Sequence, residues 1–195
     1  ASLYPSCIIS ENISHDSICL EKKYQGEDGK QLIQDIGLSF KDISYSTYKW
    51  VDPSIRSKGK VKTGEKTCRF IQYPDGKKSI LGMIEENLLS ERKKMKKKMN
   101  QEKDPILKEI YDGEQLAIKL TCNSLYGQLG AETSPIFMLD LAASVTATGR
   151  KLLYMARDKI QNRFEGAEAL YGDTDSVFIN FKPKDENGVL LKGKE

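Results

Sequence analysis

Hydrophobic residues recur with helical spacing in the middle of the chain. Within residues 79–101 they fall on one stripe of a helix, and Asp104-Pro105 interrupts the pattern. A second helical pattern starts after Pro105 and continues to Gly127 and Gly130, which should end it. Because the connection is short, we expect the two helices to form an antiparallel hairpin. The positions that carry the two patterns are Ile80, Ile84, Leu88, Met95, Met99, Leu107, Ile110, Leu116, Leu120 and Asn123.

The segments before these helices have weaker patterns. The opening "ASLYPSCIIS" predicts a short apolar strand, a turn at Tyr4-Pro5 and an apolar segment, Cys7 to Ile9, of unassigned type. Residues 21–67 are polar and lack sustained periodicity, so we expect irregular structure with short strands. The stretch "CRFIQYPDG" predicts a strand from Cys68 to Tyr73 that ends in a turn at residues 74–76.

The segments after the helical pair predict a third helix and a pair of strands. The stretch "LAASVTATGRKLLYMARDKI" favours a helix from about Leu139 to Phe164, with small residues suited to close packing. Two strands should flank Asp173, and the apolar residues on both sides predict that these strands are partly buried. The small residues are Ala142, Ala143, Ala147 and Gly149, and the apolar strand residues are Leu170, Tyr171, Val177, Phe178, Ile179 and Phe181.

Composition limits the class of protein. With 195 residues and 38% hydrophobic content, the chain suits one domain or one and a half. It has no apolar run of about 18 residues and no secretory signal, so we expect neither a spanning helix nor a membrane partner. Its four cysteines form no C-x-x-C pair, which argues against a structural metal and for an intracellular, reducing compartment. These are Cys7, Cys19, Cys68 and Cys122, and only His15 could join them.

The basic charge is local. The chain has 31 Lys and Arg against 28 acidic residues, but six basic residues fall in the seven positions from Arg92 to Lys98. Arg92 and Lys96 are four positions apart on one helix face, where they could clamp phosphates. The remaining lysines are interpreted as a solvated face or a nonspecific contact with nucleic acid, and for the run as a whole a solvated face is the simpler interpretation.

The stretch "YGDTDSVFIN" contains the sharpest chemical feature. Asp173 and Asp175 are two positions apart, so in an extended or tightly turned segment both carboxylates can project to one side. Two carboxylates that close repel each other unless a cation lies between them. Paired carboxylates on a rigid hairpin suit a two-metal centre, whereas a lone pair of aspartates is also typical of a solvated turn.

A second candidate is "KLTCNSLYG", residues 119–127. On a helix Lys119, Asn123 and Tyr126 lie on one stripe, where a cation, an amide and an aromatic ring could hold a triphosphate and a base pair. The alternative is an ordinary amphipathic helix with a solvated lysine and a core tyrosine.

Taken together, these stretches resemble a known family. The motifs "SLYPS" at residues 2–6, "KLTCNSLYG" at 119–127 and "YGDTDS" at 171–176 are similar to the three polymerase motifs of family B DNA polymerases. The Arg92 and Lys96 helix is similar to the basic helix of their fingers. The stretches "SCIISENISHDSIC" and "YSTYKWVDP" most resemble the replicative polymerases of large double-stranded DNA viruses, such as those that infect algae.

The resemblance implies a fold class and a division of the chain. It predicts an α+β fragment of a larger polymerase fold, with an antiparallel palm sheet packed on helices and a projecting two-helix fingers hairpin. Residues 1–78 would be a palm segment with an irregular insert, 79–128 the fingers hairpin, and 129–195 the palm helix and catalytic hairpin. The expected partners are primer-template DNA, deoxynucleoside triphosphates and, for the full-length enzyme, a sliding clamp.

The resemblance also implies residue roles. Asp175 would bind both of two Mg2+ ions, with Asp173 in a supporting role, and Tyr4 would lie beneath the sugar of the incoming nucleotide. Gly127 would allow close approach of the substrate. The triphosphate would be bound by Arg92, Lys96, Lys119, Ser2 and the Leu3 backbone, and the nascent base pair would be contacted by Asn123 and Tyr126.

One departure from the family pattern affects the expected activity. In the family an aspartate stands three positions before the serine of "SLYPS", and this chain starts at Ala1, after that position. The upstream exonuclease region and the downstream thumb are also expected to be absent. We therefore expect a fragment without appreciable activity of its own.

Two alternatives remain at this point. A metal-dependent sugar-nucleotide transferase also uses D-x-D, but it needs a βαβ nucleotide-binding region before that motif. A nucleic-acid-binding module with an acidic turn needs no metal, so magnesium should not change its affinity for DNA.

Overall fold

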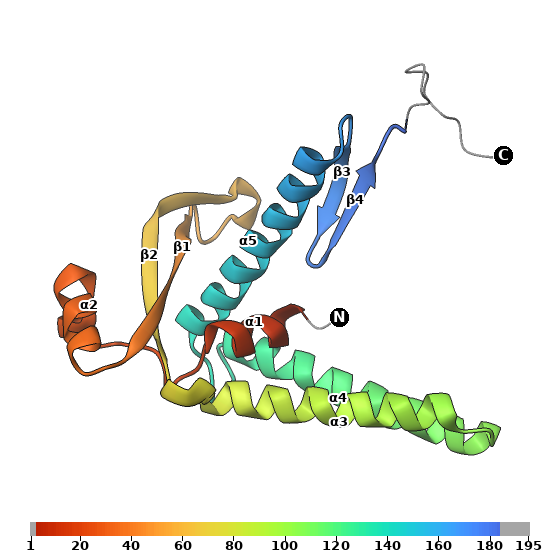
Figure 1. Cartoon of the computed structure of the whole chain (residues 1–195). Helices are drawn as coiled ribbons and strands as arrows, with labels where there is room; N and C mark the ends of the chain where they lie inside the picture. The colour runs from red at the N-terminus through yellow and green to blue at the C-terminus, as the bar shows by residue number, and fades with distance from the viewer. Residues whose placement is uncertain (1–2, 184–195) are drawn as a thin grey trace. The chain divides into compact units, whose positions relative to one another are not determined.

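The computed structural model describes residues 3–183, which divide into two compact units. One comprises residues 3–147 and the other begins at Thr148. The fold is α+β, as expected, with five α-helices and two separate two-stranded antiparallel sheets among the described residues (Figure 1). No helix in this part of the chain is both long and apolar enough to cross a membrane.

The first described element is helix α1, Leu3–Glu11, so the predicted opening strand is wrong. A short apolar run cannot be assigned to strand or helix from its periodicity alone. Pro5 is compatible with the first turn of a helix, because the backbone N–H groups there have no intrahelical partner. Burial of Cys7 and Ile8 against α3 and α4 then stabilises the helix.

A single buried side chain, Asn12, joins the end of α1 to two other elements. Its Nδ2 donates to the carbonyl of Ile71 at 2.8 Å, and its Oδ1 accepts from the backbone N–H of Ser79 at 2.7 Å. Its backbone φ is 58°, in the left-handed region that asparagine tolerates better than most residues. The side-chain amide of Asn12 therefore links the end of α1 to β2 and to the residue that precedes α3.

Residues 21–67 are more regular than predicted. They contain helix α2, Gly26–Asp35, strand β1, Ser39–Trp50, and most of strand β2, Lys60–Gln72, which pairs with β1 in an antiparallel ribbon. Much of the ribbon is exposed on both faces, so its sequence lacks the alternation by which a half-buried strand is recognised. The predicted strand from Cys68 is confirmed as the end of β2. The short 3-10 helices are η1, Lys22–Tyr24, η2, Arg56–Lys58, and η3, Pro74–Gly76.

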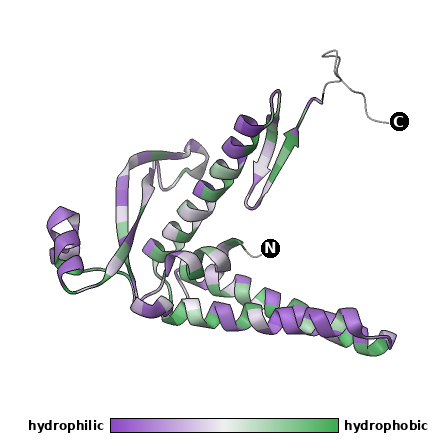
Figure 2. Cartoon of the chain, in the orientation of Figure 1, coloured by the Kyte–Doolittle hydropathy of each residue, from purple (hydrophilic) through white to green (hydrophobic). Residues whose placement is uncertain are grey.

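The predicted helical hairpin is confirmed as α3, Ile80–Gln101, and α4, Pro105–Gly130 (Figure 1). Asp104 caps α4 by accepting from the backbone N–H of Ile106 at 2.8 Å. Gly127 lies inside α4 rather than ending it. The hairpin is largely hydrophilic toward its tip, where the basic run lies (Figure 2).

The core of the unit that comprises residues 3–147 lies where α1, the ribbon, α3, α4 and the start of helix α5 meet. Helix α5 extends over Leu139–Arg163, close to the predicted range, and only its first residues belong to this unit. Buried residues that form this core are Cys7, Ile8, Ile13, Ile43, Cys68, Phe70, Leu81, Leu129, Leu141, Ala142 and Val145.

The unit that begins at Thr148 contains the rest of α5 and a second hairpin. Its strands are β3, Glu168–Asp173, and β4, Ser176–Asn180, which pair antiparallel with a bulge between Ala169 and Tyr171. The predicted pair of strands around Asp173 is confirmed.

Candidate active site

The two aspartates lie at the turn of the β3–β4 hairpin. Asp173 is the last residue of β3 and pairs with Ser176, so Thr174 and Asp175 form a two-residue turn. Ser176 Oγ donates to the Asp173 carbonyl at 3.0 Å, and Thr174 Oγ1 donates to Asp173 Oδ1 at 3.0 Å. Both aspartates are exposed, so their carboxylates keep free oxygen lone pairs.

The backbone at this turn is unfavourable for its sequence. Thr174 has a φ of 49°, in the left-handed region, which a β-branched residue rarely adopts. Such a conformation costs on the order of 1 to 3 kcal/mol, and residues that adopt it cluster at functional sites. An ordinary solvated turn favours glycine or asparagine at such a position, so the threonine in the left-handed region distinguishes this turn.

The strands that carry this turn are more exposed than predicted. Leu170 is 64% exposed and Phe178 is 60% exposed, whereas only the face that carries Val177 and Ile179 is half-buried. The rings of Tyr171 and Phe178 pack on each other across the strands, with centroids 5.9 Å apart, rather than under another element. The expected burial of both strands is wrong for these residues, because a single ribbon has few neighbours among the described residues to cover it.

The residues of "KLTCNSLYG" lie on α4. The side chains of Lys119 and Asn123 are exposed and make no hydrogen bond or ion pair with another described residue. Tyr126 is half-buried, and its ring lies 4.3 Å from the ring of Tyr4, centroid to centroid, with 32° between the planes. Burial, and then the neighbouring Tyr4, raise the pKa of Tyr126. The structure thus brings together two predicted site residues that are 122 positions apart in the sequence.

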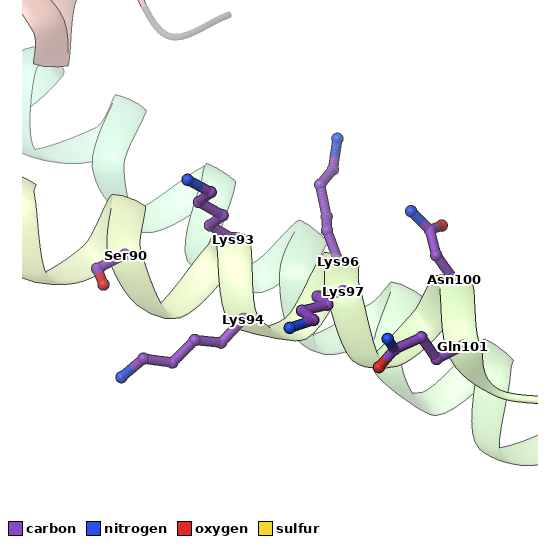
Figure 3. A pocket seen from close by; sticks show the side chains of 7 residues that line it. All are labelled: Ser90, Lys93, Lys94, Lys96, Lys97, Asn100 and Gln101. Carbon is purple, nitrogen blue, oxygen red and sulfur yellow. The ribbon is translucent and has the colours of Figure 1, made fainter.

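The basic residues of α3 differ in their surroundings. Arg92 is half-buried and its Nε donates to Gln115 Oε1 on α4 at 3.2 Å, so it links the two helices of the hairpin. Lys96, one turn further along, is exposed and extends away from the helix (Figure 3). Lys93 and Lys97 are also exposed on this stretch of α3. Of the two residues predicted to clamp phosphates, Arg92 is therefore held in place by Gln115, whereas the ammonium group of Lys96 is solvated.

The remaining predicted residues are placed as follows. Ser2 lies outside the described residues, and Leu3 is the first residue of α1. Gly127 is exposed, and apart from its chain neighbours and the adjacent backbone of α4 no described atom lies within 4 Å of where its Cβ would be, so any further close approach there would come from a bound group. Asp173 and Asp175 belong to the unit that begins at Thr148, and the other described candidates belong to residues 3–147.

The aspartate turn fits a hard divalent cation in the type of ligand it offers. Carboxylate oxygens are the ligands that Mg2+ prefers. Among residues 3–183 no group of three His, Cys, Asp or Glu side chains is arranged to hold a metal ion. The described residues therefore supply two carboxylates toward such a site.

Sequence reasoning missed a buried acid in the hairpin. The face of α3 that packs inward contains Leu81, Glu85 and Leu88, whereas Ile80 and Ile84, which also belong to the helical pattern, are exposed. Glu85 is fully buried, and burial raises its pKa to about 7. The seven-residue spacing of Leu81, Leu88 and Met95 was the signal that could have found this face.

A profile described as DNA polymerase family B matches residues 1–195. The chain belongs to DNA polymerase family B. The motif resemblance is thereby confirmed at the level of the family, and the transferase alternative is excluded. In agreement, the described residues from Pro105 to Arg163 are almost entirely the helices α4 and α5, without a βαβ unit.

Two viral DNA polymerases are among the similar proteins. The DNA polymerase of Phaeocystis pouchetii virus is 40% identical over 225 residues, which cover 100% of this chain and 21% of the relative. The DNA polymerase of Pyramimonas orientalis virus is 38% identical over 236 residues, which cover 98% of this chain and 18% of the relative. This family B chain therefore spans about a fifth of the length of these relatives.

A solved structure supports the fold. The family B DNA polymerase of the archaeon Pyrobaculum calidifontis matches with a TM-score of 0.58 and 22% identity, over 91% of this chain and 19% of that one. This match confirms the expectation that the chain has an α+β fold and corresponds to one part of a larger polymerase fold.

Proposed function

We propose that the intact protein that contains this family B chain is a DNA-templated DNA polymerase that serves viral genome replication. It would add deoxynucleotides from their triphosphates to a primer 3′-hydroxyl, with primer-template DNA as its partner and a sliding clamp as a further one. The observation that carries this proposal is the family match over the whole chain, together with viral DNA polymerases about 40% identical to it.

The hairpin of α3 and α4 supplies the cations for the triphosphate. Lys96 and Lys119 have no acidic partner among the described residues, and Arg92 commits only its Nε to Gln115. Charge-assisted contacts to phosphate oxygens would use these free donors. In this proposal the Leu3 backbone and Ser2 contact the β and γ groups.

The contact of Tyr4 with Tyr126 supports the sugar and base assignments. Because the two rings pack together, a change in either one alters the surface that the other presents. We assign Tyr4 to the sugar of the incoming nucleotide, and Asn123 and Tyr126 to the nascent base pair. Gly127 leaves open space beside them.

Family B polymerases generally use divalent metal ions, and we assign Mg2+ to Asp173 and Asp175 in the intact enzyme. When bound, such ions stabilise the charge on the attacking and leaving oxygens of phosphoryl transfer. In this proposal the β3–β4 hairpin holds both carboxylates at its turn. The hydroxyl of Thr174 orients the carboxylate of Asp173.

The proposal is tested by kinetics of the intact enzyme with Lys119→Ala and, as the matched control, Lys108→Ala on the exposed surface of the same helix. One lost charge-assisted contact, roughly 1.5 to 3 kcal/mol, predicts a tenfold to hundredfold loss of kcat/KM for the nucleotide with unchanged Kd for primer-template DNA. The control should behave as wild type. A loss of DNA affinity without a kinetic effect would instead place Lys119 on the path of the duplex.

A second measurement addresses the aspartates. Asp175→Asn in the intact enzyme should nearly abolish primer extension while leaving DNA affinity unchanged in the absence of metal. Undiminished extension by this variant would refute the assignment of the metal site.

A further inference from the structure

The β1–β2 ribbon is firmly held at its base. Arg69, 3% exposed, donates from Nε and Nη2 to the two carboxylate oxygens of Asp42, each at 2.7 Å, and from Nη1 to the carbonyl of Tyr24 at 2.8 Å. Further along, Tyr45 Oη and Lys66 Nζ both donate to Asp140 at the start of α5, at 2.6 and 2.7 Å. The ribbon is thus anchored as far as the cross-strand pair Tyr45 and Lys66.

Beyond this pair the ribbon continues as a segment that we call the ribbon tip, residues 46–65. Its side-chain bonds are short-range: Thr47 bonds to Thr63, and Asp52 accepts from both Ser54 and Lys58. Lys62 Nζ donates to Glu65 Oε1 at 2.8 Å in an exposed ion pair, which a phosphate would have to replace, whereas Lys60 has no acidic partner among the described residues. Large apolar side chains are nevertheless exposed here, which are Tyr48, Trp50, Val51, Ile55 and Val61. A two-stranded ribbon gains little stability from such exposed groups, so folding alone does not account for them.

One face of the ribbon tip combines aromatic rings with lysines. Tyr48 and Trp50 are two positions apart on β1 and therefore share a face. Lys62 and Lys60 lie directly opposite them on β2, so their side chains project from the same face. Lys60 Nζ lies 4.4 Å from the centre of the Trp50 ring. Tyr48 is 55% exposed and Trp50 is 38% exposed, so both rings remain accessible in part.

This combination matches single-stranded nucleic acid better than it matches duplex DNA or protein. Aromatic rings offer platforms on which unstacked bases can stack, and neighbouring lysines neutralise the phosphates that connect them. In a duplex the faces of the bases are already stacked, so exposed rings would gain little. A face with two lysines beside two rings is also more basic than the centre of a typical protein interface.

We propose that this face, Tyr48, Trp50, Lys60 and Lys62, binds the single-stranded template strand. The inference rests on the proposed polymerase function, and it adds a contact that lies on the ribbon rather than among the nucleotide-binding residues. Because the base of the ribbon is anchored, a strand bound at the ribbon tip would be attached to the same unit that contains α3 and α4.

The test uses the intact polymerase and two DNA ligands, a primer-template with a long single-stranded template overhang and a blunt-ended duplex. Tyr48→Ala should weaken binding to the overhang substrate roughly tenfold, the size of one lost base-aromatic stack, and leave the blunt duplex unchanged. Tyr48→Phe keeps the ring and should bind as wild type.

The salt dependence of DNA binding tests whether Lys60 contacts a phosphate and Lys49 does not. Lys60→Gln should lower the slope of log K against log salt by about 0.7 for the overhang substrate. Lys49→Gln is the matched control, since this exposed lysine is on the opposite face of the same ribbon. Hydrogen exchange of residues 39–50 checks that the ribbon stays folded in each variant.

Equal losses on both substrates, an equal effect of Lys49→Gln and Lys60→Gln, or unchanged affinity in Tyr48→Ala would each overturn the proposal. The polymerase function is judged separately, from nucleotide kcat/KM with saturating primer-template, which these variants should leave unchanged.

Discussion

Glu85 should make the stability of the α3–α4 hairpin depend on pH, and the size of this effect follows from the burial of its side chain. Its side chain is fully buried between helices, and neither carboxylate oxygen has a hydrogen-bond partner among the described residues. The Cys122 thiol of α4 is close enough to influence its pKa, but a thiol is a weak donor. Burial dominates and raises the pKa of Glu85 from 4.5 to about 7.

The sign of the effect follows from proton binding. Between pH 4.5 and about 7 the folded hairpin keeps a proton on Glu85 that the opened hairpin has released, so the free energy of opening falls as pH rises. The full difference is about 3 kcal/mol, at about 1.36 kcal/mol per pH unit. Above about pH 7 both forms are ionised and the loss is complete.

Hydrogen exchange of α3 peptides in the intact protein measures this free energy between pH 5 and 8, after correction for intrinsic exchange rates. The wild type should lose most of the 3 kcal/mol over this range. Glu85→Gln removes the titrating group and should flatten the profile, whereas Glu86→Gln, an exposed neighbour, should leave the wild-type slope. If the slope persists in Glu85→Gln, another group titrates and the reasoning about Glu85 fails.

Three further outcomes are expected. In the intact enzyme Tyr4→Val should raise the ratio of ribonucleotide to deoxynucleotide kcat/KM, because the ring would no longer block a 2′-hydroxyl; an unchanged ratio would remove Tyr4 from this role. Asp104→Ala should lower the stability of the first turn of α4 by about 1 kcal/mol, seen as faster exchange at Ile106, because a capping acceptor is lost. Gly29→Ala should destabilise α2, since its Cβ would lie 2.1 Å from the Tyr24 carbonyl carbon, and wild-type exchange rates in α2 would contradict this.

The helical hairpin of α3 and α4 could be predicted from short-range features of the sequence. The stop at Asp104-Pro105 acts within a few residues, and the apolar periodicity of α3 and α4 is long enough to exclude a strand, so both helices were predictable. The buried face of α3 was not predicted, although Leu81, Leu88 and Met95 mark it, because Glu85 interrupts this apolar stripe with a residue that is seldom buried. The β1–β2 ribbon was missed for the opposite reason, since both of its faces are largely polar and exposed.

The sequence alone determined the family, through three motifs whose joint spacing is specific, and with it the candidate residues from Tyr4 to Asp175. It could not determine that α1 is helical or that Tyr4 packs on Tyr126, because both depend on contacts with residues far away in the chain. Likewise, only the tertiary structure showed that the carboxyl group of Glu85 is buried and that those of Asp173 and Asp175 are exposed at a turn. Residue type sets the chemistry that a side chain can perform, whereas burial and neighbours, which no local pattern specifies, set its charge and its partners.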